Sequence, residues 1–228
     1  MAPSSQETIY FGYGSNLWQH QMQLRCPTST YLGVARLNGY RWIINERGYA
    51  NVVEGGGDAD ADADDEKDDD GDADSGIDNK YASVVFGLVY ALQPSDEHAL
   101  DKNEGVPVAY TKESLPCDFW TGVADASTAI PSTTDEQKWI KVDTTRPPTK
   151  TARTMLVYID RKRTALGRPR EEYVVRMNQG VRDALARGVP RGYVEGVVRR
   201  FVKGGGGEGV EDLALRQAGR FEDESGVV

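Results

Sequence analysis

The chain has 228 residues, with 27 basic and 36 acidic side chains, a net charge of −9 and 39% hydrophobic residues. This length predicts one domain with additions, and the low apolar fraction indicates that part of the chain does not pack. Two cysteines exclude a disulfide framework, and no apolar run is long enough to cross a bilayer. Because the N-terminus also lacks a signal sequence, we expect a cytoplasmic protein with no membrane partner.

The first predicted element lies at residues 10–17, Tyr-Phe-Gly-Tyr-Gly-Ser-Asn-Leu. A short strand leads into glycines, and Ser15 or Asn16 can cap a helix that ends before Pro27. Backbone amides at a strand–turn–helix junction suit an anion or an oxyanion. The alternative is an ordinary structural turn. Nucleotide-binding loops fit poorly, because the third glycine and the Gly-Lys-Ser/Thr triplet are missing.

The next predicted elements are three strands and an insertion. Residues 30–37 and 40–45, joined by Asn38-Gly39, are predicted as a β-hairpin, and residues 49–53 as a short strand. Residues 54–80 hold 13 acidic residues and 2 lysines, whereas the rest holds 23 acidic and 25 basic residues. We expect this insertion to be disordered. A run inside it resembles the start of a calcium loop but lacks the final glutamate, which favours solvated charge.

Apolar patterning predicts the remaining elements. They are a central strand at 81–92, a helix from Pro94 to about Glu104, strands at 110–120 and 153–160, and helices at 173–185 and 190–202, with a second insertion at 121–150. Strands with interleaved helices indicate an α+β domain at 1–203, followed by a flexible tail at 204–228.

Glu104 is the candidate catalytic residue. It follows a short helix, where the negative end of the helix dipole raises a carboxyl pKa, and a general base near neutral pH needs such a shift. From position alone, a solvated surface glutamate is the alternative. The two histidines have no partner at metal-ligand spacing, so we predict neither a metal nor a cofactor.

Four motifs, in order, resemble the γ-glutamylcyclotransferase family. They are YFGYGSNL at 10–17, VFGLVYAL…LDKNEGV…Y from Val85 to Tyr110, YVVRMNQG at 173–180 and ALARGVPRGYVEGV at 184–197. The resemblance implies a small mixed β-barrel flanked by helices, with the glycine loop and Glu104 at one rim. It also implies a lyase-type enzyme that cleaves γ-glutamyl amino acids to 5-oxoproline and a free amino acid without a cofactor.

The same resemblance implies residue roles. Glu104 would act as base and then acid, on an α-amine that attacks its own γ-carbonyl. The implied substrate-binding residues are Tyr10, Phe11, Gly12, Tyr13, Gly14, Ser15 and Tyr173. Tyr13, Tyr110 and Tyr158 could line the pocket and raise the pKa of Glu104 by desolvation. The partner is then a small γ-glutamyl molecule, and the chain could also form a homodimer.

Two alternatives stay open. A cyclotransferase for glutathione or for γ-glutamylamines would share the fold, although Asn16 and the turn at 188–190 favour the γ-glutamyl amino acid branch. A non-catalytic anion- or nucleic-acid-binding module is the second, because residues 161–203 hold 12 basic and 4 acidic side chains. We favour amphipathic helices with basic outer faces and no nucleic-acid partner, since aromatics for stacking are few there.

Overall fold

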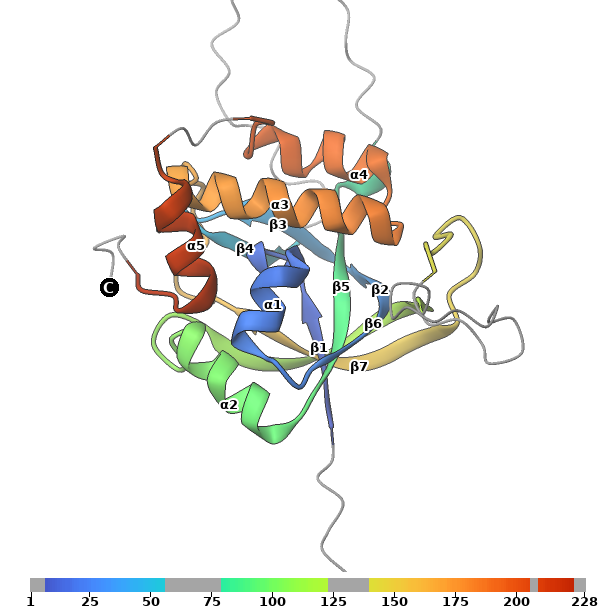
Figure 1. Cartoon of the computed structure of the whole chain (residues 1–228). Coiled ribbons are helices and arrows are strands. Elements are labelled where there is room, and N and C mark those ends of the chain that lie inside the picture. The colour runs from blue at the N-terminus through green and yellow to red at the C-terminus, as the bar shows by residue number, and fades with distance from the viewer. Residues whose placement is uncertain (1–6, 56–78, 123–139, 206–208, 224–228) are drawn as a thin grey trace, which may run out of the picture.

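The computed structural model describes residues 7–55, 79–122, 140–205 and 209–223 (Figure 1). Five strands close into a barrel in the order β1-β5-β2-β6-β7. Their bounds are Thr8–Gly12 for β1, Thr30–Asn38 for β2, Val84–Leu92 for β5, Thr111–Thr121 for β6 and Lys150–Ile159 for β7. All pairs are antiparallel except β1 with β7. The predicted small mixed β-barrel of an α+β domain is therefore confirmed.

The predicted central strand is β5, which lies between β1 and β2. Every residue from Val85 to Leu92 is buried, as expected for a strand covered on both faces. Close packing requires a glycine at position 87, because a Cβ there would lie 2.5 Å from the carbonyl oxygen of Gly12 and 2.7 Å from the Phe11 ring. The bare glycine allows Phe11, which is fully buried, to fill the space beside β5.

Helices flank the barrel (Figure 1). They are α1 at Gln19–Arg25, α2 at Pro94–Asn103, α3 at Glu171–Arg187, α4 at Arg191–Gly196 and α5 at Glu211–Gly219, with 3-10 turns η1 at Ser15–Leu17, η2 at Asn79–Tyr81 and η4 at Val198–Arg200. The predicted helix around Tyr173 is α3, and it ends at Gly188 with a φ of 108°. Gly180 allows α3 to approach η1, because a Cβ there would lie 2.9 Å from the Leu17 Cβ.

The predicted hairpin at Asn38-Gly39 is wrong. Strand β2 pairs with β5 and β6 in the barrel, whereas β3 (Tyr40–Ile44) pairs with β4 (Ala50–Glu54) in a separate two-stranded sheet. The Gly39 amide donates to the Ser83 carbonyl at 2.8 Å, and the Gly39 carbonyl accepts from the Gly55 amide at 2.8 Å. The turn thus passes the chain from one sheet to the other, and long-range pairing overrides the local hairpin signal.

The helix after the glycine loop also differs from its prediction. Residues 15–17 form the 3-10 turn η1, and α1 begins only at Gln19, without a side-chain cap from Ser15 or Asn16. The Gln19 amide donates to the Asp183 carboxylate at 2.8 Å. A protein carboxylate therefore already holds the first amide of this helix.

The two insertions and the tail lie partly outside the described residues. The predicted disorder at 54–80 and the calcium-loop-like run fall largely within 56–78, and most of the second insertion within 123–139. The described part of 204–228 differs from a flexible tail, because α5 buries Ala214 and Ala218 and Arg25 binds its last carbonyls. Within the described ranges, no helix is both long and apolar enough to cross a membrane.

Candidate active site

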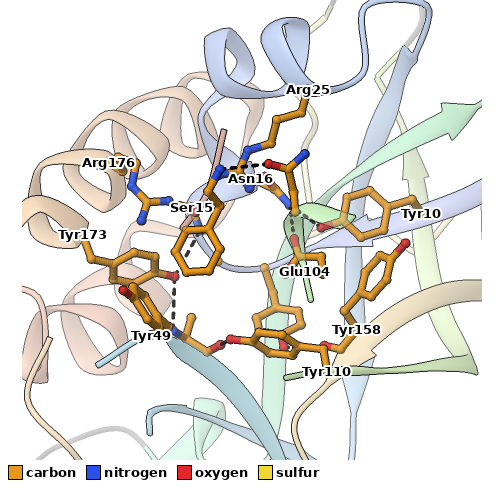
Figure 2. Close-up of a pocket in the computed structure, with 15 residues that line it drawn as sticks. Tyr10, Ser15, Asn16, Arg25, Tyr49, Glu104, Tyr110, Tyr158, Tyr173 and Arg176 are labelled. Carbon is orange, nitrogen blue, oxygen red and sulfur yellow. Dashed lines mark hydrogen bonds between the residues drawn. The ribbon is translucent and has the colours of Figure 1, made fainter. Parts of the chain in front are cut away.

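A pocket opens where the glycine loop, the end of α2, strand β4, helix α3 and the segment after α5 meet (Figure 2). Its empty volume is about 450 Å³ with the open mouth included. The lining is rich in tyrosine: Tyr10, Tyr13, Tyr49, Tyr110, Tyr158 and Tyr173. Most of the other lining residues are Gly14, Ser15 and Asn16 of the glycine loop, Arg25, Arg176 and Glu104.

Glu104 enters this pocket from the C-terminal end of α2. Its backbone amide still donates to the Leu100 carbonyl at 2.8 Å, and Gly105, with a φ of 63°, turns the chain away directly afterwards. Burial raises the pKa of the Glu104 carboxyl above its ordinary value, against the opposing effects of Arg25 and the Asn16 hydrogen bond. The predicted direction agrees, but desolvation replaces the helix dipole as the main cause.

Asn16 connects Glu104 to the rest of the loop. Its Nδ2 donates to Glu104 Oε1 at 2.9 Å and to the Tyr10 hydroxyl at 2.8 Å (Figure 2). Its Oδ1 accepts from Gln21 Nε2 at 2.7 Å and from Arg25 Nη1 at 3.3 Å. Because two donors hold the oxygen, the amide is fixed with its nitrogen toward the carboxylate.

Three hydroxyls around Glu104 already accept hydrogen bonds from the protein. The Tyr10 hydroxyl accepts from Asn16. Ser15 Oγ accepts from Gln21 Nε2 at 2.9 Å and from Arg176 Nη1 at 3.0 Å.

The Tyr173 hydroxyl accepts from the backbone amides of Ser15 and Ala50, both at 3.2 Å. Within the described part of the chain, none of the three hydroxyls of Tyr10, Ser15 and Tyr173 donates to a protein acceptor. Each can therefore donate its own proton to a ligand.

The other pocket tyrosines use their protons within the protein. The Tyr13 hydroxyl donates to the Tyr158 carbonyl at 2.6 Å, the Tyr110 hydroxyl to the Ala50 carbonyl at 2.9 Å, and the Tyr158 hydroxyl to Asp101 Oδ1 at 2.7 Å. Burial raises the pKa of all three phenols, with Glu104 adding to it. These phenols stay neutral at neutral pH, and their rings line the pocket that also holds Glu104.

Two buried arginines were not expected from the sequence. Arg176 is bound by both oxygens of Glu172, at 2.8 and 2.9 Å. Burial, with nearby Arg176, lowers the pKa of Arg25 to about 10, so it still carries a charge at neutral pH. One signal could have identified Arg176, because it lies three residues after Tyr173 on the apolar stripe of α3.

The structure brings together most of the predicted site residues, namely Tyr10, Tyr13, Gly14, Ser15, Glu104 and Tyr173. Phe11 and Gly12 are not among the lining residues. Phe11 packs in the barrel core, because neighbouring residues of a strand point to opposite faces, and Gly12 is paired with Leu88 at the end of β1. The Ser15 amide, predicted to hold an anion, instead donates to Tyr173.

Comparisons with known proteins agree with the motifs. No protein-family model matches the chain. It is 29% identical over 105 residues to human γ-glutamylcyclotransferase, covering 46% of this chain and 47% of the relative, so it spans about half the length of that curated protein. The resemblance to the γ-glutamylcyclotransferase family is confirmed.

Two solved structures share the fold. One is an uncharacterized human protein, with a TM-score of 0.54 and 20% identity over 92% of this chain and 98% of that one. The other is a γ-glutamyl cyclotransferase, with a TM-score of 0.54 and 18% identity over 92% and 99% of the two chains. At these identities the match shows a common architecture around the barrel.

Proposed function

We propose that this chain, which resembles the γ-glutamylcyclotransferase family in sequence and fold, converts γ-glutamyl amino acids to 5-oxoproline and a free amino acid. The observation that carries the proposal is the half-buried Glu104 carboxylate, oriented by Asn16 and facing hydroxyls with protons to donate. These groups suit a substrate that carries its own nucleophile. Glu104 supplies the proton transfers, and the loop supplies the donors.

The reaction joins two atoms of the same substrate. The α-amine nitrogen attacks the γ-carbonyl carbon, a five-membered ring forms, and the bond from that carbon to the leaving nitrogen breaks. Intramolecular attack in a fixed geometry can reach effective molarities of about 10⁵–10⁸ M. The protein therefore needs to fold the glutamyl chain and move protons, and a nucleophilic side chain has no role in this step.

Glu104 carries the proton between the two nitrogens. An α-amine titrates at about 7.7–8.0 and is mostly protonated near neutral pH, so a base must remove its proton before attack. The ionised carboxylate of Glu104 accepts that proton before attack and then gives it to the leaving nitrogen. The ring nitrogen loses its second proton to the regenerated carboxylate, which passes it to solvent. The raised pKa of Glu104 makes the first transfer, the acceptance of the amine proton, more favourable than it would be to an ordinary carboxylate.

The hydroxyls of Tyr10, Ser15 and Tyr173 donate hydrogen bonds to the negatively charged oxygens of the substrate. A γ-glutamyl group brings an α-carboxylate, and attack places developing charge on the γ-carbonyl oxygen. One preorganised donor to such an oxyanion contributes about 10²–10³ in kcat. The charge of Arg25, which also donates to Asn16, further favours an anionic substrate.

The proposal is tested by 5-oxoproline release from γ-glutamyl-alanine, glutathione and γ-glutamyl-ε-lysine. We expect release from γ-glutamyl-alanine, and loss of at least about a hundredfold in Glu104→Gln, the size typical of a missing acid–base group. Glu195→Gln is the matched control, because that side chain is 58% exposed on α4. Release only from glutathione or from γ-glutamyl-ε-lysine would move the assignment to another branch of the same fold.

A binding module is disfavoured by the partners of the basic residues at 161–203. Arg161 pairs with Glu113 at 2.7 Å and Arg176 with Glu172 at 2.8 Å. Arg163 pairs with Asp160 at 3.1 Å. These three of the twelve basic residues in this region therefore have acidic partners within the fold.

A further inference from the structure

The segment after α5 supplies a wall of the pocket that lies outside all four motifs. Phe221 is a lining residue. Its ring packs edge-on against Tyr49, with 5.0 Å between centroids, and the Arg176 guanidinium lies 5.6 Å from the centroid of the Phe221 ring. The Phe221 amide donates to Asn103 Oδ1 at 3.0 Å. Phe221 thus extends from the α3 side of the pocket to the residue directly before Glu104.

This wall is anchored through the two residues that follow Phe221. The Gln217 side chain accepts from the Glu222 amide at 2.8 Å and donates to the Glu222 carbonyl at 3.0 Å. Arg47, whose side chain is fully buried, donates through Nε to Asp223 Oδ2 at 3.0 Å. The position of the ring is therefore set by specific polar contacts as well as by packing.

The same segment is tied to the groups that orient Glu104. Arg25 donates through Nε to the Ala218 carbonyl at 2.9 Å and through Nη2 to the Gln217 carbonyl at 2.7 Å. Its remaining nitrogen donates to Asn16 Oδ1. Hydrogen bonds therefore connect the end of α5 to the glycine loop, and Phe221 is a built part of the same site.

We propose that Phe221 determines which leaving amino acids the pocket accepts, an inference that rests on the proposed function. Glu104 and the three hydroxyls serve the polar glutamyl half of the substrate. The rings of Tyr49 and Phe221, which pack edge-on against each other, offer apolar surface to the side chain of the leaving amino acid. Phe221 fills part of that space, so it restricts the leaving group to small side chains.

The test compares γ-glutamyl-alanine with γ-glutamyl-phenylalanine in the full chain, by 5-oxoproline release. In Phe221→Ala we expect the ratio of kcat/KM for the phenylalanine substrate over the alanine substrate to rise about tenfold or more, the scale on which a pocket discriminates apolar size. Phe221→Leu should shift the ratio in the same direction by less. Leu215→Ala is the control on the preceding helix α5, because Leu215 is 51% exposed, and its ratio should equal that of the wild type.

The outcomes separate this inference from the proposed function. If the wild type releases 5-oxoproline from neither substrate, the proposed function fails, and the inference with it. If the wild type is active but both Phe221 variants, with wild-type circular dichroism, keep the wild-type ratio, only the inference is overturned. A fall in kcat/KM by the same factor for both substrates also overturns it, because that result marks a purely structural role.

Discussion

Replacing Asn16 by leucine tests how Glu104 is tuned. The substitution keeps a similar volume but removes the Nδ2 donor that lies 2.9 Å from Glu104 Oε1. That hydrogen bond stabilises the ionised carboxylate and lowers its pKa, whereas burial raises it. Without the donor, only the nearby arginine charges oppose burial, so the pKa of Glu104 must rise further.

The size of the shift follows from the strength of the bond. A hydrogen bond to a charged group contributes about 1.5–3 kcal/mol, and one pKa unit corresponds to about 1.36 kcal/mol, so the expected rise is about one to two units. The reaction needs Glu104 ionised in the free enzyme. The acidic limb of the profile of kcat/KM against pH should therefore move about one to two units toward higher pH.

The assay is 5-oxoproline release at saturating and subsaturating substrate. It covers about two pH units on either side of neutral pH, from about pH 5 to about pH 9. Asn178→Leu is the matched control, because Asn178 lies outside the pocket and binds exposed carbonyls. An acidic limb that stays in place, or moves toward lower pH, in folded Asn16→Leu would refute the reasoning. A change in maximal rate without a shifted limb would show that Asn16 contacts substrate and leaves the pKa of Glu104 unaffected.

Two further predictions concern Glu104 and Tyr173. Because the folded-state pKa of Glu104 is raised above its ordinary value of 4.5, the native state binds the proton more tightly than the unfolded state, and stability falls as pH rises through that interval. Glu104→Gln should accordingly have a higher Tm than the wild type at pH 8 but not at pH 4 by circular dichroism, and equal differences at both values would contradict this. Tyr173→Phe should lower kcat about a hundredfold, because it removes a hydrogen-bond donor and leaves the amides of Ser15 and Ala50 without their acceptor. Tyr40→Phe is the control, because the Tyr40 hydroxyl is exposed. An unchanged kcat in Tyr173→Phe would exclude a role for the Tyr173 hydroxyl as a donor to the substrate.

The sequence was most informative where local pattern and tertiary structure agree. The run of apolar residues in β5 needs cover on both faces and receives it in the barrel. The 3.6-residue spacing around Tyr173 gave the buried face of α3, and Gly188 marked its end. Glu104 could be located because a helix end, a glycine and the ordered motifs all converge on it.

Long-range contacts determine the features that local sequence patterns did not predict. The Asn38-Gly39 turn has a hairpin sequence, yet pairing with β5 and β6 places β2 in the barrel without β3. No local signal shows that Phe221, more than 100 residues after Glu104, packs beside it. Likewise, the sequence shows Arg25 only as a cation at the end of a helix. Its hydrogen bonds to the carbonyls at the end of α5 depend on the tertiary fold.

The central claim is that the γ-glutamyl group closes on itself with Glu104 moving the proton. The most direct measurement follows both products from γ-glutamyl-alanine, with the wild type and with Glu104→Gln. We expect 5-oxoproline and alanine in equal amounts from the wild type, and neither above background from a Glu104→Gln protein with wild-type circular dichroism. Release of glutamate in place of 5-oxoproline, or undiminished 5-oxoproline from the variant, would contradict the account.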